Sequence, residues 1–398
     1  MQVIDSLTQI LQTRCPQIHQ MRLAALMTNV VALVQGQTLT VTGLGRHSPR
    51  PTSTKHAIKQ SDRLVGNAHL HHERISLYHA VSHCLLSPHS RPLITLDWSD
   101  YTYDRRWVLL RAAVPVGGRA LTLYEEVHPV ACYGNPRVQQ QFLRTLATLI
   151  PESVRPILVT DAGFIGPWFR QVLSQGWDYV GRIRPNLLYR ETPQDPWQRC
   201  MTLYPRATRR PTYCGQVQLA RRQPLTCHLH LYREASKGRH QRTPAGKRSQ
   251  RKISRANALR ETSPWLLVTS LSPHDYPARR IMQCYRTRMQ IEQAFRDIKN
   301  YRHGLRLRLT RSHCPQRLAT LLLIGMLASF CVWLVGRLAE AQTLHYQFQA
   351  NTRRDKRVLS LFFLGLQCLK RGTIDWHQRD FKTSLRLLNN DITSLSIV

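Results

Sequence analysis

The chain has 398 residues, of which 42% are hydrophobic, so it can bury a substantial core and hold two or three domains. Lysine and arginine number 57 against 23 acids, and the formal charge of +34 favours a polyanionic partner, nucleic acid first and an anionic membrane surface second. The ten cysteines are scattered without a C-x-x-C pair and the start lacks a secretion signal, which argues against a zinc ribbon, a disulfide framework or export and predicts a cytoplasmic protein.

Residues 1–85 are predicted to be helical and to hold a candidate helix-turn-helix. Ser53 and Thr54 are good N-terminal caps for a helix that Gly66 ends, and residues 39–44 precede it as the start of a helix-turn-helix. Basic residues recur every four positions along this helix and form one cationic stripe: Lys55, Lys59 and Arg63. The stripe fits along DNA, although a solvated basic face has the same pattern.

Residues 91–183 have the order of elements of a ribonuclease-H-like core. The hydrophobic patterns predict strands at 91–97, 107–114 and 119–127, a helix at 138–150, a strand at 156–161, a helix at 168–173 and a strand at 177–183. The turn Pro115–Gly118 makes a hairpin of the second and third strands. The fold class is therefore predicted to be α/β, with a mixed sheet as its core.

Two of these strands end in an acid. Asp97 closes the first strand, and Asp161 closes the fourth, with the turn residue Gly163 two positions further on. Such strands bring carboxylates to one edge of a sheet, where active sites of α/β layers are commonly built. These two acids are therefore candidates for a catalytic site.

The composition changes between residues 185 and 263, where short strand patterns alternate with polar loops. Residues 233–260 hold ten lysines or arginines against the single acid Glu234, with too little apolar surface for a core of their own. We interpret this segment as a β-rich insertion with a basic, DNA-contacting loop. The strand pattern at 265–270 then returns the chain to the sheet.

A helix from Tyr285 to Lys299 carries the most specific pattern of the chain. Offsets of three, seven and fourteen from Tyr285 place Arg288, Glu292 and Lys299 within a narrow arc of one face. An apolar stripe about a quarter turn away allows the same helix to pack on a core. Arg288 and Glu292 also fit a plain surface ion pair, but the two strand-end acids favour a metal-dependent phosphodiester site.

Residues 311–398 are predicted to be a helical region. Within them, Leu318–Gly336 is a run of 19 uncharged, mostly apolar residues, which is long enough to span a bilayer. Because the run contains Thr320, Ser329 and two glycines, and the chain has no other such run, we interpret it as a helix buried in the protein. A membrane anchor is the alternative.

Together these motifs resemble the DDE transposases of bacterial insertion sequences, in the branch that forms DNA hairpins. The signature of that branch is Tyr, two residues, Arg, three residues, Glu, six residues and Lys, and the helix at Tyr285 matches it without a gap. The first family acid fits Asp97 and the second fits Asp161. The resemblance covers nearly the whole chain. It implies a helical DNA-binding domain at 1–85, a ribonuclease-H-like catalytic domain at 86–310 that the β-rich insertion interrupts, and a helical dimerisation region at 311–398.

The resemblance implies that Asp97, Asp161 and Glu292 are catalytic and hold two Mg²⁺ or Mn²⁺ ions, which suit carboxylate and water ligands better than zinc does. It further implies residues that hold DNA: Arg288 and Lys299 on phosphates, Tyr285 beside the same backbone segment, and Trp265 stacked on a flipped base. Two more candidates for phosphate contacts are Arg182, at the end of the strand pattern at 177–183, and Arg184, just after it. A buried strand tryptophan and surface arginines without a specific task are the alternatives.

The function implied by the resemblance is cut-and-paste transposition of an insertion sequence. Water cleaves one strand at the element end, the 3′ hydroxyl attacks the opposite strand to form a hairpin, a second water opens it, and the 3′ end attacks target DNA. The implied partners are double-stranded DNA, as terminal inverted repeats and as target, and a second copy of the chain on that DNA, with no membrane. An inactive protein that binds the element ends without cutting them is the alternative, and the presence of all three acids favours the enzyme.

Overall fold

The computed structural model describes residues 2–100, 106–235, 243, 246–255, 263–350, 352–353 and 355–397. The chain forms two compact units: the first unit joins Met1–Pro156 to Thr287–Ile397, and the second unit is Ile157–Arg286. The α/β class, the ribonuclease-H-like order of three strands, helix, strand, helix and strand, and the helices at both ends are confirmed. The domain boundaries at residues 85 and 310 stay a prediction.

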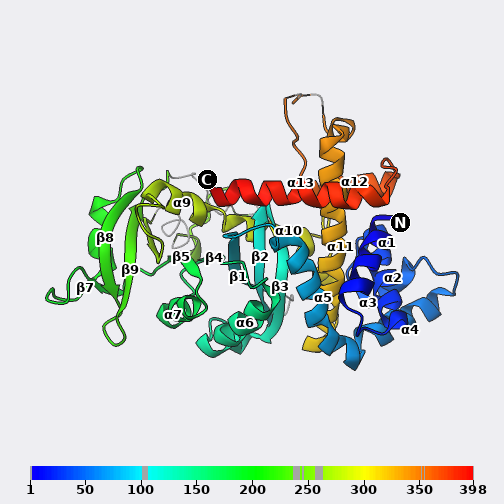
Figure 1. The fold of residues 1–398 in the computed structure, drawn as a ribbon, viewed down its shortest axis with the longest axis horizontal. Coiled ribbons are helices and arrows are strands. Elements are labelled where there is room, and N and C mark those ends of the chain that lie inside the picture. The colour runs from blue at the N-terminus through cyan, green and yellow to red at the C-terminus, as the bar shows by residue number, and fades with distance from the viewer. Residues whose placement is uncertain are drawn as a thin grey trace. The chain divides into compact units, whose positions relative to one another are not determined.

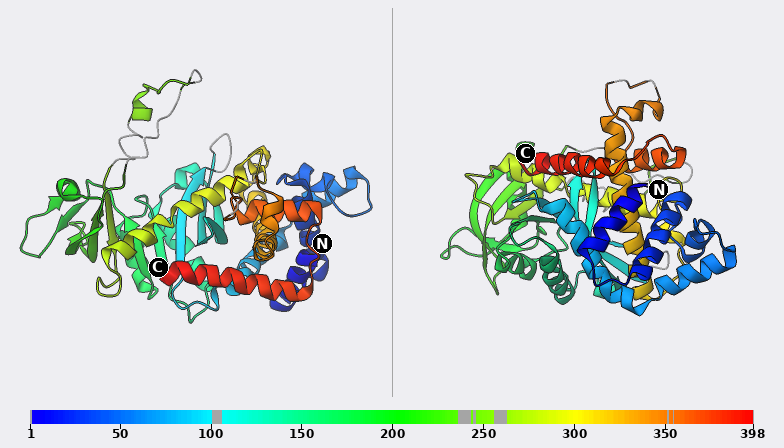
Figure 2. Two further views of the ribbon diagram at one scale, coloured as in Figure 1. Left: turned by 90° about the horizontal axis from the view of Figure 1, so that it is seen from above. Right: turned by 45° about the vertical axis from the view of Figure 1, so that its right-hand side comes forward.

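The first unit begins with a group of helices that includes the predicted basic helix. They are α1 Gln2–Arg14, α2 Gln20–Gly36, α3 Val41–Arg46, α4 Thr54–Val65 and α5 Ala68–Leu86. Helix α4 begins and ends as predicted, because the Ser53 hydroxyl accepts the His56 backbone N–H and Gly66 follows the last residue. Its buried residues include Ala57 and Leu64. The helix packs on α2 and α3, among the blue helices near the N-terminus (Figure 2). This packing turns the opposite side of α4 toward solvent.

An antiparallel meander of three strands follows in the first unit: β1 Leu93–Asp100, β2 Trp107–Val116 and β3 Arg119–Pro129. The helices η1 Val130–Cys132 and α6 Pro136–Leu149 come after it. The turn between β2 and β3 is Gly117-Gly118, both with positive φ (53° and 81°), so the predicted turn is shorter than expected and Pro115 still lies in β2. Helix α6 covers one face, where the rings of Phe142 and Tyr124 lie 5.0 Å apart, and α10 Met289–Lys299 covers the other.

The C-terminal part of the first unit is built around one long apolar helix. Its elements are η3 Leu307–Leu309, α11 Pro315–Ala341, η4 Leu344–Gln347, α12 Leu361–Arg371 and α13 Gln378–Ile397. In the described part of the chain, α11 is the one helix long and apolar enough to cross a membrane, and 94% of its most apolar window is buried. This burial agrees with a core helix rather than an anchor. Helix α13 crosses α11, and α2 packs against α11 (Figure 1).

Two close contacts tie this region together. A Cβ on Gly336 of α11 would lie 2.0 Å from the Leu361 carbonyl oxygen of α12, and a Cβ on Gly365 would lie 2.0 Å from the Val332 carbonyl oxygen, so only glycine permits this approach. The two ends of the first unit also meet, since the Trp376 indole N–H donates to the Ser6 hydroxyl at 3.4 Å.

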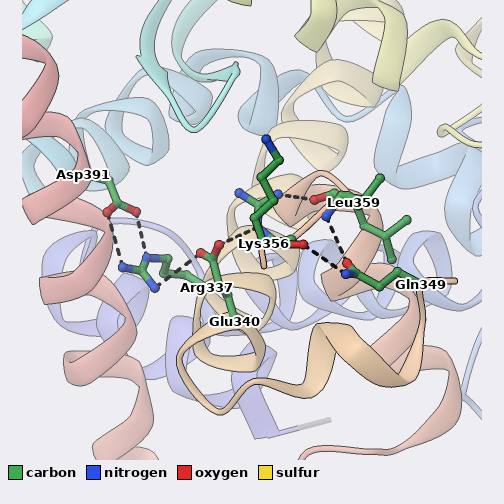
Figure 3. A network of polar contacts seen from close by, with 8 residues as sticks. Arg337, Glu340, Gln349, Lys356, Leu359 and Asp391 are labelled. Atoms are coloured by element: carbon green, nitrogen blue, oxygen red, sulfur yellow. Dashed lines mark hydrogen bonds and ion pairs between the residues drawn. The ribbon is translucent and has the colours of Figure 1, made fainter. Parts of the chain in front are cut away.

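A polar network fixes the segment between α11 and α12 (Figure 3). Arg337 of α11 binds Asp391 of α13 at 2.7 Å and Glu340 at 3.4 Å, and Glu340 in turn accepts from Arg357 at 2.6 Å. Gln349 donates to the Lys356 carbonyl oxygen at 3.0 Å. Arg357 is thus bound to α11, and Gln349 is bound to Lys356.

The second unit is built on a mixed sheet in the order β4-β5-β10-β9-β8-β6-β7. Strands β4 and β5 are parallel, and the other neighbours are antiparallel. The elements are β4 Ile157–Thr160, α7 Gly166–Ser174, β5 Asp178–Arg182, β6 Leu188–Arg190, β7 Gln198–Arg199, η2 Cys200–Arg206, β8 Thr212–Leu219, β9 Leu225–Tyr232, β10 Trp265–Thr269 and α9 Ala278–Arg286. The strands β6 to β9 of the segment at 185–263 therefore extend the sheet, which they join where β9 pairs with β10. Much of the basic loop predicted at 233–260 lies outside the described residues.

Candidate active site

The candidate site of the first unit lies between β1 and α10. Residues two apart on a strand face the same side, so Asp97 and Ser99 point together toward α10. Asp97 is buried, and its Oδ1 accepts the backbone N–H of Trp98 at 2.8 Å. The prediction that Asp97 ends its strand is wrong, because β1 keeps pairing with β2 as far as Asp100. The carboxylate of Asp97 nevertheless faces α10.

Arg288 joins two of the three predicted acids. Its Nη1 donates to Asp97 Oδ2 at 3.0 Å, and its Nη2 lies 2.7 Å from Glu292 Oε1. The i, i+4 ion pair that the sequence offered as an alternative is present, but the same guanidinium also binds an acid 191 positions away in the chain. Glu292 keeps 41% of its side chain exposed, so this carboxylate faces solvent beside a buried one.

Lys299 holds the other end of α10 against β1. Its Nζ donates to the Ser99 hydroxyl at 2.5 Å and lies 5.1 Å from the centre of the Phe295 ring. Burial, followed by the nearby charge of Arg111, lowers the pKa of Lys299 to about 8. The lysine therefore loses its charge at a lower pH than an exposed lysine does.

The predicted single helix from Tyr285 to Lys299 is wrong. Helix α9 ends at Arg286, a turn follows, and α10 begins at Met289. The Ile291 N–H donates to a carbonyl only three residues back, that of Arg288, at 3.2 Å, which is the geometry of a tight turn. Tyr285 is buried in the second unit, whereas Arg288 binds an acid of the first unit, and these two anchors override the helical period.

Trp265 and Tyr285 belong to an aromatic cluster of the second unit. The Trp265 ring contacts those of Tyr285 and Tyr232 edge to face, with centroids 5.0 and 5.3 Å away. Arg286 Nη2 donates to the Tyr232 hydroxyl at 2.7 Å. Trp265 is half-buried, so its ring packs in the cluster and is partly open to solvent, and its base-stacking role stays a prediction.

Asp161 lies directly after β4, in the turn that the sequence predicts. Its Oδ1 accepts the Gly163 backbone N–H at 2.9 Å, and Arg184 Nε donates to the Ala162 carbonyl oxygen at 3.2 Å. Arg184 therefore braces the turn of the second acid, while Arg182 lies half-buried at the end of β5. Asp161 belongs to the second unit, and its convergence with Asp97 and Glu292 stays a prediction.

The donor set suits a hard divalent cation. Asp97 and Glu292 offer carboxylate oxygens that one guanidinium brings together, and oxygen ligands are those that Mg²⁺ and Mn²⁺ prefer. Among the residues that the structure describes, no three His, Cys, Asp or Glu side chains are placed to hold one metal ion. The predicted two-ion site therefore stays a prediction.

The predicted cationic stripe is exposed on α4. Lys55, Lys59 and Arg63 all face solvent. Arg63 also borders a hollow of about 370 Å³ between α2 and α4, which Arg22 and Arg50 line as well. The exposed positive charge of α4 is therefore the stripe itself, because Arg22 is paired with Glu73 at 2.6 Å.

Sequence reasoning missed the charged residues that lie beneath α10. Arg111 and Glu125 form a buried ion pair, and Ser99 is the partner of Lys299. Arg111 left a signal, because it is the one charged residue of the apolar strand β2. Glu125 stands beside Glu126, and its pairing with Arg111 depends on the register of the two strands.

Comparison with known proteins places the chain in a family. Residues 102–330, more than half of the chain, match the transposase DDE domain. The protein belongs to the DDE transposases, which act in DNA transposition with divalent metal ions. The match includes Asp161 and Glu292 and begins just after Asp97.

One solved structure similar to the chain is a piggyBac transposase synaptic complex with hairpin DNA, determined by cryo-EM. The TM-score is 0.40 and the sequence identity 9%, over 98% of this chain and 83% of that one. No curated protein sequence matches the chain.

Proposed function

We propose that the protein is the transposase of a bacterial insertion sequence and that Asp97, Asp161 and Glu292 are its catalytic acids. The observation that carries this proposal is the guanidinium of Arg288, which holds Asp97 and Glu292 together from elements far apart in the chain. A structural ion pair needs one acid, whereas a phosphodiester site needs several carboxylates within reach of one another. Cut-and-paste transposition in the cytoplasm, with a homodimer assembled on DNA, follows from the resemblance of the signature.

The acids would hold Mg²⁺ or Mn²⁺, which supplies an activated water and compensates the charge that develops on the phosphate. The chain's own residues then bind and orient the DNA. Arg288 presents a planar fork and Lys299 a compact ammonium beside Ser99, both suited to phosphate oxygens. In the proposed order, water releases a 3′ hydroxyl, that hydroxyl attacks the opposite strand and leaves a hairpin, and a second water reopens it.

The second unit would hold the distorted DNA near the hairpin. A base rotated out of the helix has an aromatic partner in Trp265, whose ring is supported from two sides by Tyr232 and Tyr285. Arg184 is bonded to the turn after Asp161 and is exposed, so it can contact a phosphate there. The stripe on α4 would bind the terminal inverted repeat outside the cleaved position.

The test uses purified protein and DNA that carries the repeats flanking its coding region. With Mg²⁺, we expect nicks and then hairpins at the element ends, and Asp97→Asn or Glu292→Gln is expected to abolish both products while the DNA is still bound. Asp355→Asn, a change of an exposed acid in the first unit, should cleave as the parent does. DNA that is bound but never cut would identify instead an inactive protein that recognises the ends.

A further inference from the structure

Asp97 is one member of a row of charged residues across the sheet of the first unit. It pairs in register with Arg111 of β2, and Arg111 pairs in register with Glu125 of β3. Residues opposite each other on antiparallel strands have Cβ atoms about 4.5–5.5 Å apart on the same face. Arg111 therefore stands between two acids, each within the reach of its long side chain.

Arg111 binds only one of these acids in the contacts that the structure shows. Its Nε and Nη2 donate to Glu125 Oε2 at 2.8 and 2.6 Å, and the Tyr78 hydroxyl donates to the other oxygen of Glu125 at 3.3 Å. Arg111 Nη1 makes no hydrogen bond within the described residues. The side chains of Arg111 and Glu125 are 0% and 1% exposed. The Phe295 ring of α10 covers the guanidinium, with its centre 4.7 Å from Arg111 Cζ.

Stability alone does not explain such a pair. Removing both charges from water is costly, and replacing a buried ion pair by apolar residues of similar volume is often neutral or stabilising. Removing one partner is different, because it leaves a buried charge that must find another counter-ion. For Arg111 the nearest alternative on its own row is Asp97.

We propose that Glu125 is a positioning residue for the active site: it ties Arg111 to β3 and so keeps a buried guanidinium off the Asp97 carboxylate. Asp97 then stays available to the divalent cation, an inference that rests on the function proposed above. Arg288 also binds Asp97, but it belongs to the start of α10 and binds Glu292 at the same time. It therefore does not replace Glu125, which holds Arg111 on the sheet. Loss of Glu125 would add a competing cation to a metal ligand.

The experiment measures Mn²⁺ binding to the full-length protein without DNA, by electron paramagnetic resonance of the free ion. Glu125→Gln is expected to raise the dissociation constant roughly tenfold, the scale of an outer-shell change at a metal site. The double variant Arg111→Met with Glu125→Leu removes the competitor as well and should return to within about twofold of the parent. Glu73→Gln, which breaks the Arg22–Glu73 pair, is the matched control and should bind as the parent does.

Each outcome decides between defined cases. A folded Glu125→Gln protein with parental Mn²⁺ affinity overturns the inference, as does a double variant that stays as weak as the single one. If thermal unfolding shows that Glu125→Gln does not fold, the double variant decides alone, and a tenfold loss of its affinity refutes the role of Arg111 as competitor. If the Asp97→Asn variant binds Mn²⁺ as tightly as the parent protein does, the ion is bound elsewhere. The proposed function then fails, and not only this inference.

Discussion

At the scale of single residues, two cations of α10 have different tasks because they are buried among different partners. Arg288 bridges two acids by direct ion pairs, whereas Lys299 donates its hydrogen bond to a hydroxyl and lies near an aromatic ring. Burial and the charges of Arg111 and Arg308 disfavour the ammonium of Lys299 more than Asp100 and Asp97 favour it. This difference makes Lys299 sensitive to pH.

The pKa of about 8 gives Lys299 a defined pH dependence. The ammonium that binds a phosphate is present below this pKa. DNA affinity is therefore expected to fall as the pH rises through and above about 8, and Lys299→Met should remove that part of the dependence.

The free energy of unfolding should change in the opposite direction. Between about pH 8 and 10.5 the unfolded chain binds more protons than the folded chain at this lysine, so the lysine adds stability as the pH rises across that window. DNA-binding anisotropy and thermal unfolding from pH 7 to 10 measure both effects, and identical profiles for parent and variant would contradict them.

Arg288 is expected not to tolerate lysine. One ammonium cannot place two nitrogens on two acids in the way that the guanidinium places Nη1 and Nη2, so Arg288→Lys should reduce DNA cleavage by roughly ten- to a hundredfold. Arg353→Lys, at an exposed position of the first unit, serves as the control for charge. Cleavage by Arg288→Lys at the parental rate would show that the bridge is dispensable.

At the scale of elements, local patterns predicted the helices and strands that their own residues determine. The cap at Ser53 fixes the start of α4, and the glycine pair fixes the turn between β2 and β3. The prediction of one helix from Tyr285 to Lys299 was wrong, because the break depends on contacts of Tyr285 with β10 and of Arg288 with β1. A short stretch of sequence does not contain these contacts. The buried row beneath α10 was missed for the same reason, since register between strands is a tertiary property.

Helix α4 supports a prediction about DNA affinity. Because Lys59 is exposed and makes a charge contact with a phosphate in the proposed complex, Lys59→Gln should weaken binding to all sequences alike and reduce the slope of log affinity against log salt by about 1. Lys356→Gln, an exposed lysine near α12, should leave the slope unchanged. Equal slopes for parent and Lys59→Gln would exclude this face of α4 from the interface.

At the scale of the whole molecule, the composition predicted the partner and a helical core, but not how the helices approach each other. The run at Leu318–Gly336 has the composition of a membrane span, and only its packing in α11 shows that protein covers it. Gly336→Ala is expected to destabilise the first unit by about 2 kcal/mol or more, because the added methyl group meets backbone of α12. Gly325→Ala in the same helix meets a leucine methyl at 3.0 Å and should cost less, and similar chemical denaturation of the two variants would refute the close approach.

The contact of Trp376 with Ser6 couples the last part of the polypeptide to the first. A ribosome has to translate α11, α12 and most of α13 before helices α1 and α2 obtain their final neighbours. A gene interrupted by a late stop codon would therefore yield a product whose amino-terminal helices are incompletely packed.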